Sequence, residues 1–172
     1  AMTRVYLKKS TKTASTGSDD VRETVMNILN EIEVGGDAVA LKYANKFDGY
    51  EGNLILTDAE IKVACDLVPG KLKRDIQFAH DNVRRFAEAQ KETISDFETE
   101  IVPGLIAGQK SIPCNAAGCY IPGGRYSHIA SAIMTVTTAK VAGCAHITAC
   151  SPPAKNSGVA PAIVYAAHLC GA

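Results

Sequence analysis

Apolar residues in the first part of the chain recur every three or four positions, the spacing that places them on one face of an α-helix. Ser18 precedes two aspartates and is a good N-cap for the first helix. The Gly35-Gly36 pair ends this pattern, and Asp37 can cap a second helix that continues to Phe47. The pattern therefore predicts two consecutive helices at the start of the chain.

Two further helices are predicted before residue 95. Thr57 and Glu60 form a capping box ahead of a short apolar run. Pro69 suits the first turn of the long helix that follows. The inward face predicted for this helix consists of Leu72, Ile76, Ala79, Val83, Phe86 and Ala87. We therefore expect residues 1–95 to form an N-terminal helical arm.

The apolar period changes to two after residue 95, as is typical of β-strands. Phe97, Thr99 and Ile101 alternate with two glutamates, as in a strand with one exposed face. Pro103-Gly104 marks a turn, and residues 105–112 are expected to return as the second strand of a hairpin. Residues 96–116 are thus interpreted as a strand and hairpin connection.

Strands and helices alternate from residue 117 onward. We expect strands at 117–121 and 146–150, a helix from Ser127 or His128 to Ala142, and a helix from Ser157 to Cys170. This order predicts an α/β fold with a parallel sheet and right-handed crossovers. Two strands are fewer than a finished sheet contains, so the chain is expected to end part-way through this domain.

Charge is distributed unevenly along the chain. Lys+Arg and Asp+Glu both number 18, and this zero net charge argues against a nucleic-acid partner. Every Asp and Glu lies before residue 101, and residues 111–172 contain only Arg125, Lys140 and Lys155 as charged side chains. The uncharged part is expected to be buried. No apolar run reaches membrane-spanning length and no signal segment is recognised, so we expect a cytoplasmic protein without membrane contact.

The cysteines and histidines have no spacing that indicates a disulfide framework or a metal site. Three of the six cysteines, Cys144, Cys150 and Cys170, lie in apolar patterns and are interpreted as buried thiols. His80, on the long helix, is expected at the surface. His146 and His168 lie in apolar segments and are interpreted as structural histidines.

The most informative stretch is the turn after the strand at 117–121. Pro122-Gly123-Gly124 lies between a strand and a helix, where glycines let the backbone approach a ligand and free N–H groups attract anions. A phosphate-binding P-loop is poorly supported, because Gly124 stands where its lysine belongs. A ligand-binding turn and a plain tight turn remain equal alternatives.

Three side chains flank this turn. Arg125 and His128 could clamp an anionic substrate group or lie in solvent, and Tyr120 could stack on a cofactor or belong to the core. The residues alone leave these alternatives open, with the core favoured for Tyr120. No nucleophile–base constellation is identified in the sequence.

Several ordered segments together resemble the histidinol dehydrogenase family. They are "GCYIPGG", "AKVAGC", "ACSPP" and "YAAHLCG", together with "ILNEIEVGGDAVALKYANKFDG" near the start, so the likeness extends over about residues 19–172. The resemblance implies an NAD-dependent, zinc-containing homodimer that oxidises a primary alcohol to a carboxylate through an aldehyde. It also implies that residues 117–172 are the first part of a Rossmann-like domain, truncated relative to the family.

The resemblance also implies which residues meet the cofactor. Tyr120 matches the tyrosine that contacts NAD, and Pro122, Gly123 and Gly124 match the turn beside it. The zinc ligands and the Glu-His general-base pair of the family are expected beyond Ala172, so no catalytic or metal-ligating residue is assigned in this chain. By itself, the chain is expected to be inactive.

The segment "GGRYSHIAS" departs from the small and hydroxyl residues usual in histidinol dehydrogenases. It is more similar to the sulfopropanediol dehydrogenase branch of the family, which oxidises 2,3-dihydroxypropane-1-sulfonate to sulfolactate. Arg125, with His128, would then face the anionic sulfonate of a small polyol substrate. The alternatives are oxidation of histidinol to histidine, a non-catalytic fragment that binds a nucleotide or a partner, and a purely structural domain.

Overall fold

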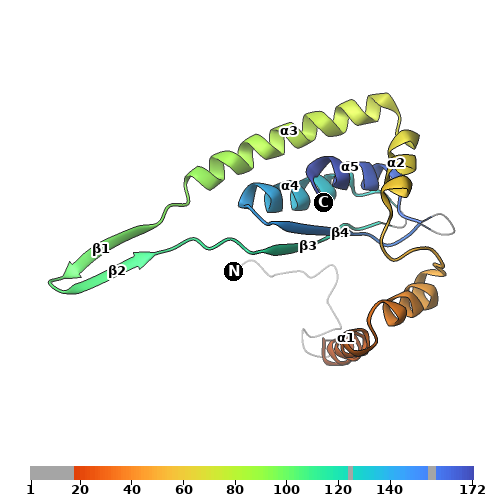
Figure 1. Ribbon diagram of the computed structural model, residues 1–172, viewed down its shortest axis with the longest axis horizontal. Helices are drawn as coiled ribbons and strands as arrows, with labels where there is room; N and C mark the ends of the chain where they lie inside the picture. The colour runs from red at the N-terminus through yellow and green to blue at the C-terminus, as the bar shows by residue number, and fades with distance from the viewer. Residues whose placement is uncertain (1–17, 124–125, 155–157) are drawn as a thin grey trace, which may run out of the picture. The chain divides into compact units, whose positions relative to one another are not determined.

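The computed structural model describes residues 18–123, 126–154 and 158–172 and combines helices with two small sheets (Figure 1), which confirms the predicted α/β class. The elements in chain order are α1 Ser18–Asp48, α2 Asp58–Leu67, α3 Gly70–Glu92, β1 Phe97–Val102, β2 Leu105–Gln109, β3 Ala116–Tyr120, α4 Ile129–Ala142, β4 His146–Cys150 and α5 Pro161–Cys170. Within the described residues, every helix is too short or too polar to span a lipid bilayer.

The chain divides into two compact units, Ala1–Phe47 and Asp48–Ala172. The boundaries that we predicted at residues 95 and 116 fall inside the second unit and separate its elements. The assignment of residues 117–172 to the first part of a larger, Rossmann-like domain stays a prediction.

The first unit contains two helical segments, as predicted. α1 is interrupted at Gly36, whose φ of 59° and ψ of −148° lie outside the helical region. Glycine adopts this positive φ without steric penalty because it has no Cβ. The Tyr43 hydroxyl donates to Glu31 Oε2 at 2.8 Å and so joins the segments on either side of the kink. The Tyr43 and Phe47 rings stack with their centroids 5.6 Å apart.

The second unit begins with the loop before α2, and the predicted capping box is present there. Thr57 Oγ1 accepts from the Glu60 N–H, and Glu60 Oε2 accepts from the Thr57 N–H at 2.7 Å. α3 begins one residue later than expected, with Pro69 as its N-cap.

Two predictions on the inward face of α3 were wrong. His80, expected at the surface, is 8% exposed, and Phe86, expected inside, is 68% exposed. The reason is geometric, because positions 76, 80, 83 and 87 lie on one helical face and residue 86 is turned about 100° away from residue 87. Ile76 and Ala87 are buried on that face, and His80 Nδ1 lies 3.1 Å from Asp81 Oδ1.

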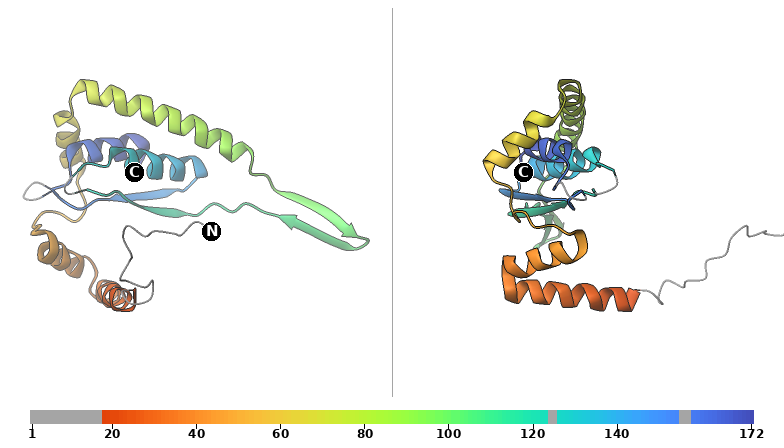
Figure 2. Two further views of the ribbon diagram at one scale, coloured as in Figure 1. Left: turned by 180° about the vertical axis from the view of Figure 1, so that it is seen from behind. Right: turned by 90° about the vertical axis from the view of Figure 1, so that its right-hand side faces the viewer.

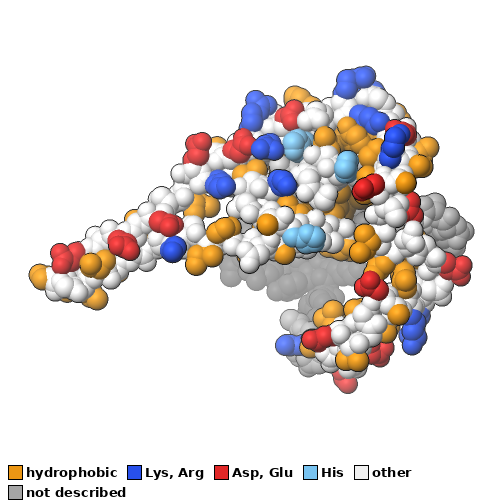
Figure 3. All heavy atoms as spheres, in the orientation of Figure 1, with side chains coloured by type: hydrophobic (Ala, Val, Ile, Leu, Met, Phe, Trp, Pro, Cys, Tyr) orange, Lys and Arg blue, Asp and Glu red, His pale blue; other side chains and the backbone are white. Residues whose placement is uncertain are grey.

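β1 and β2 form the predicted antiparallel hairpin, although its pairing ends at Gln109. The pairing runs from Phe97 opposite Gln109 to Val102 opposite Leu105, with an irregularity between Glu100 and Val102. Both faces are exposed, whereas we expected one half-buried face. The hairpin extends away from the helices of its own unit, with hydrophobic and acidic side chains along it (Figures 1 and 3).

β3 and β4 pair in parallel, as predicted, from Ala116 opposite His146 to Tyr120 opposite Cys150. α3, α4 and α5 lie on one face of this sheet (Figures 1 and 2). Cys119, Ile121 and Ile147 pack there in one core with Ala132, Ile133, Val136, Ile163 and Ala166. The predicted burial of the uncharged part of the chain is therefore confirmed for α4, α5 and this face.

The opposite face of the parallel sheet is exposed. Tyr120 is 63% exposed, so its interpretation as a core residue was wrong. His146 and Cys150 lie on the same face and are also exposed, although Cys150 was predicted to be buried. Side chains alternate between the faces of a strand, so covering only one face leaves every second residue outside the core.

Candidate functional site

The carboxyl ends of β3 and β4 separate at a defined point. The Ile121 N–H donates to the Cys150 carbonyl at 2.8 Å, which continues the parallel ladder by one bond. In that register the next donor on the β4 side would be residue 152, and this residue is a proline without an N–H. The ladder ends there. Ligands of open α/β sheets bind outside this edge.

Tyr120 and the turn after it lie at this edge. The Tyr120 side chain is mostly exposed, and Pro122 and Gly123 are half-buried. A Cβ added at Gly123 would lie 2.7 Å from Ser151 Oγ and 3.1 Å from the Pro152 carbonyl oxygen. Gly123 therefore lets the turn pack directly against the segment that follows β4.

Two of the predicted site residues, Gly124 and Arg125, lie outside the described residues. His128 is exposed and occupies the N-cap position of α4, where its side chain makes no capping hydrogen bond. Tyr120 thus ends β3 and His128 precedes α4, with the turn between them. The predicted roles of these residues toward cofactor and substrate remain predictions.

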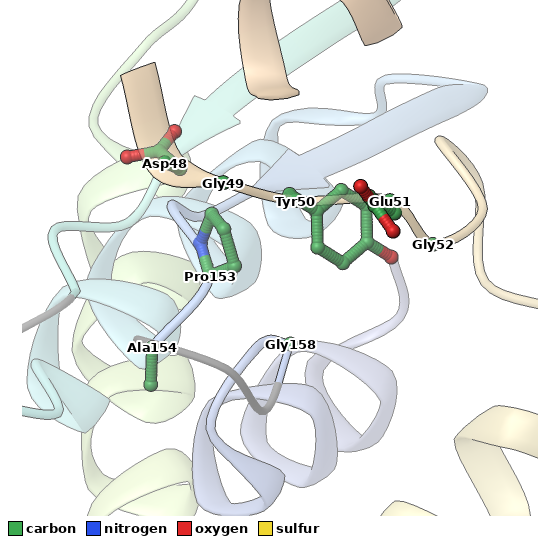
Figure 4. Close-up of a pocket in the computed structure, with 8 residues that line it drawn as sticks. All are labelled: Asp48, Gly49, Tyr50, Glu51, Gly52, Pro153, Ala154 and Gly158. Atoms are coloured by element: carbon green, nitrogen blue, oxygen red, sulfur yellow. The ribbon is translucent and has the colours of Figure 1, made fainter. Parts of the chain in front are cut away.

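A pocket of about 250 Å³ lies close to the same edge, and the sequence analysis missed it. One wall is the segment 48–52, and the other consists of Pro153, Ala154 and Gly158 (Figure 4). Residues 151–154 thus touch Gly123 through Ser151 and Pro152 and line the pocket through Pro153 and Ala154. The Asp48-Gly49 pair was visible in the sequence, but it indicated only a turn.

Short-range contacts hold the 48–52 wall in place. The Tyr50 hydroxyl donates to the Asn53 carbonyl at 2.8 Å, and Asn53 Nδ2 donates to Glu60 Oε1 at 3.0 Å. A Cβ at Gly52 would collide with the Tyr50 ring. The capping box of α2 thus also orients the loop that lines the pocket. The Thr57 N–H, which donates to the carboxylate, lowers the pKa of Glu60.

Two acidic residues belong to the described lining of the pocket. Asp48 and Glu51 lie in its 48–52 wall together with Tyr50 (Figure 4). Carboxylates accept hydrogen bonds from hydroxyl groups, as they do from nucleotide riboses at this edge of α/β sheets, and they repel anions. The volume is slightly below that of typical small-molecule sites, so it would suit one part of a dinucleotide rather than the whole.

No group of three or more His, Cys, Asp or Glu side chains among the described residues lies close enough to hold a metal ion. The six thiols are free; Cys119, Cys144 and Cys170 are buried, and Cys114 and Cys150 are exposed. Burial raises the pKa of Cys170, which makes its thiolate less accessible. The described residues therefore do not form a zinc site.

Known proteins resemble the chain over nearly its whole length. The model of the family "Histidinol dehydrogenase" matches residues 11–172. A sulfopropanediol 3-dehydrogenase from Ruegeria pomeroyi is 69% identical over 171 residues, which are 99% of this chain and 39% of that protein. A histidinol dehydrogenase from Bacteroides fragilis is 37% identical over 155 residues, 90% of this chain and 36% of that protein.

A solved structure supports the same relationship. The crystal structure of histidinol dehydrogenase from Elizabethkingia anophelis matches with a TM-score of 0.80 and 30% identity, covering 95% of this chain and 37% of that one. The chain thus spans about two fifths of the length of the relatives that it matches. The family match, the identity and the shared fold agree with the resemblance seen in the sequence. The chain belongs to the histidinol dehydrogenase family.

Proposed function

We propose that this chain is part of a cytoplasmic, NAD-dependent dehydrogenase that oxidises 2,3-dihydroxypropane-1-sulfonate to sulfolactate through an aldehyde. The observation that carries this proposal is the high identity to the Ruegeria pomeroyi sulfopropanediol 3-dehydrogenase. The segment after Gly123 supports it, because its sequence differs from the pattern usual in histidinol dehydrogenases. The homodimer implied by the family resemblance is part of the same proposal.

Features of the described edge of the sheet support a dinucleotide site as part of this proposal. The exposed Tyr120 ring offers an aromatic surface, and the Pro122-Gly123 turn lies against the segment that also lines the carboxylate pocket. We infer that Tyr120 contacts NAD and that Asp48 or Glu51 accepts hydrogen bonds from a ribose. When bound, NAD supplies the hydride acceptor for the two oxidation steps.

From the family resemblance, we propose that zinc and the general base are held by residues beyond Ala172. On the substrate side, we propose that Arg125 and His128 meet the sulfonate. Arginine is suited to this task because its planar guanidinium donates two parallel hydrogen bonds to an oxyanion.

The decisive experiment measures NAD reduction by the full-length protein with dihydroxypropanesulfonate and, separately, with histidinol. We expect kcat/KM for the sulfonate to exceed that for histidinol by at least about a hundredfold, the cost of losing a paired charge. Preference for histidinol would instead identify a histidinol dehydrogenase. A thermal shift with NAD but turnover of neither alcohol would favour the non-catalytic alternative.

The Arg125→Ala variant tests the substrate residue, with Lys140→Ala, in the last turn of α4, as a matched loss of positive charge. Arg125→Ala should raise KM for the sulfonate much more than KM for histidinol, which lacks the sulfonate group. An unchanged sulfonate KM would remove Arg125 from the binding site and leave the proposal for the reaction intact.

A further inference from the structure

The hydroxyl oxygen of Ser151 is buried and has no hydrogen-bond partner among the described residues. A buried hydroxyl without a partner destabilises a fold, and native structures contain few such groups. The residues of this chain already bury the atom, so a partner has to come from the segments packed around it. The position of Ser151 in the fold indicates which segment this is.

Ser151 is the first residue after β4, at the point where the pairing of β3 with β4 stops. The last bond of that ladder runs from the Ile121 N–H to the Cys150 carbonyl, and Pro152 has no N–H to continue it. The two segments nevertheless stay in contact, because a Cβ added at Gly123 would lie 2.7 Å from Ser151 Oγ. The Ser151 hydroxyl therefore lies against the turn, just beyond the last ladder bond.

The Gly123 N–H is the matching donor on the other side of this contact. If the ladder continued, this N–H would donate to the Pro152 carbonyl. That bond is not formed, and the Gly123 N–H has no other partner within the described residues. A backbone donor and a hydroxyl acceptor thus lie on two touching segments without being paired. A small shift of the turn would join them.

We propose that Ser151 is a positioning residue for the cofactor, and that the Gly123 N–H donates to Ser151 Oγ when NAD binds at this edge. The inference rests on the proposed function, because it takes NAD as the ligand of the turn after Tyr120. The bond fixes the backbone three residues after Tyr120. Part of the affinity for NAD therefore depends on a buried hydroxyl that the cofactor itself does not touch.

Thr137 supplies a matched control for the loss of a hydroxyl. Its Oγ1 is the other buried side-chain oxygen that lacks a partner in the described part of the chain. Thr137 lies more than two turns into α4, away from the carboxyl edge of the sheet. Thr137→Val removes the hydroxyl and nearly keeps the shape of the side chain, so it should leave the binding of NAD unchanged.

Isothermal titration of the full-length protein with NAD tests the proposal. Ser151→Ala should raise the Kd for NAD about three- to tenfold, the effect of losing one neutral hydrogen bond. The urea midpoint measured without NAD should not fall, because the hydroxyl has no partner to lose. Ser151→Cys keeps the size of the side chain but offers only a weak acceptor, so it should also raise the Kd.

Hydrogen exchange detects the proposed bond independently of affinity and turnover. NAD should slow amide exchange in the peptide that contains Gly123, and Ser151→Ala should remove most of this protection. An unchanged Kd for Ser151→Ala, a Kd that Ser151→Cys restores, or a lower urea midpoint would overturn the positioning role and leave the proposed function intact. Failure of the unmodified protein to bind NAD would overturn both.

Discussion

Replacing Gly123 by alanine should destabilise the protein through a collision at the carboxyl edge of the parallel sheet. The new Cβ would lie 2.7 Å from Ser151 Oγ and 3.1 Å from the Pro152 carbonyl oxygen. The first contact is closer than carbon and oxygen tolerate, and the second involves backbone that cannot rotate away. Overpacking of this kind costs about 1–3 kcal/mol, and we expect a loss in that range.

Gly118→Ala is the matched control, because Gly118 lies in the preceding strand and a Cβ there meets nothing within 4 Å. Its effect on the free energy of unfolding should stay within about 0.5 kcal/mol. The assay is urea denaturation of the full-length protein, with the midpoint and the slope fitted separately. A change in the dependence of the free energy of unfolding on urea concentration would indicate that the two variants differ in more than the stability of the folded state.

A double variant tests the atoms named in this explanation. Ser151 Oγ is buried and has no hydrogen-bond partner among the described residues, so Ser151→Ala alone should be neutral or slightly stabilising. Together with Gly123→Ala it removes the closest collision and leaves the contact with Pro152. The double variant should therefore recover part of the lost stability. The reasoning fails if Gly123→Ala costs no more than Gly118→Ala, or if Ser151→Ala brings no recovery.

Four further predictions concern the same unit. Tyr120→Ala should change the unfolding midpoint little, because the ring is mostly exposed. The same variant should lose most of the thermal shift that NAD causes in the unmodified protein. An undiminished shift would exclude contact between Tyr120 and the cofactor. Thr57→Ala should cost about 0.5–2 kcal/mol by removing the N-cap. The pKa of Glu60 is lowered in the folded protein, so its carboxylate stabilises the fold at neutral pH. This contribution is lost as the pH falls through the folded-state pKa. Glu60→Gln should therefore weaken the dependence of the free energy of unfolding on pH in the acidic range. Iodoacetamide should modify Cys114 and Cys150 well before Cys119, Cys144 and Cys170 in peptide mass spectra; equal rates would contradict the burial assigned here.

Features encoded by a few neighbouring residues were predictable from the sequence. The Thr57–Glu60 capping box, the helix break at Gly35-Gly36 and the hairpin turn at Pro103-Gly104 each depend on local backbone chemistry. The strand at 146–150 was predicted at both ends. It is bounded by a left-handed glycine before it and by two prolines after it, so its limits are set locally.

Features that depend on distant segments were not predictable in this way. The pocket forms only where residues 48–52 meet the loop after β4, a contact across about a hundred positions of sequence. His80 and Phe86 both lie on an amphipathic helix, and only the packing of α3 on α4 and α5 determines which of them is buried. Apolarity alone placed Phe86 inside, although its helical position turns it outward.

The exposed face of the parallel sheet connects these errors with the proposed function. Parallel strands are normally covered on both faces, whereas Tyr120 and Cys150, which we interpreted as buried, lie on a face that the described residues leave exposed. The covered face carries Cys119, Ile121 and Ile147, a typical helix-packing set, whereas the exposed face carries an aromatic ring, an imidazole, a hydroxyl and a thiol. Gly118 adds no side chain between them, so the backbone of β3 is open beside Tyr120. A face of this composition is better suited to polar contacts and to a stacked ring than to close packing of a helix. The alternation that places Cys119 in the core therefore also presents Tyr120 for the contact with NAD that we propose.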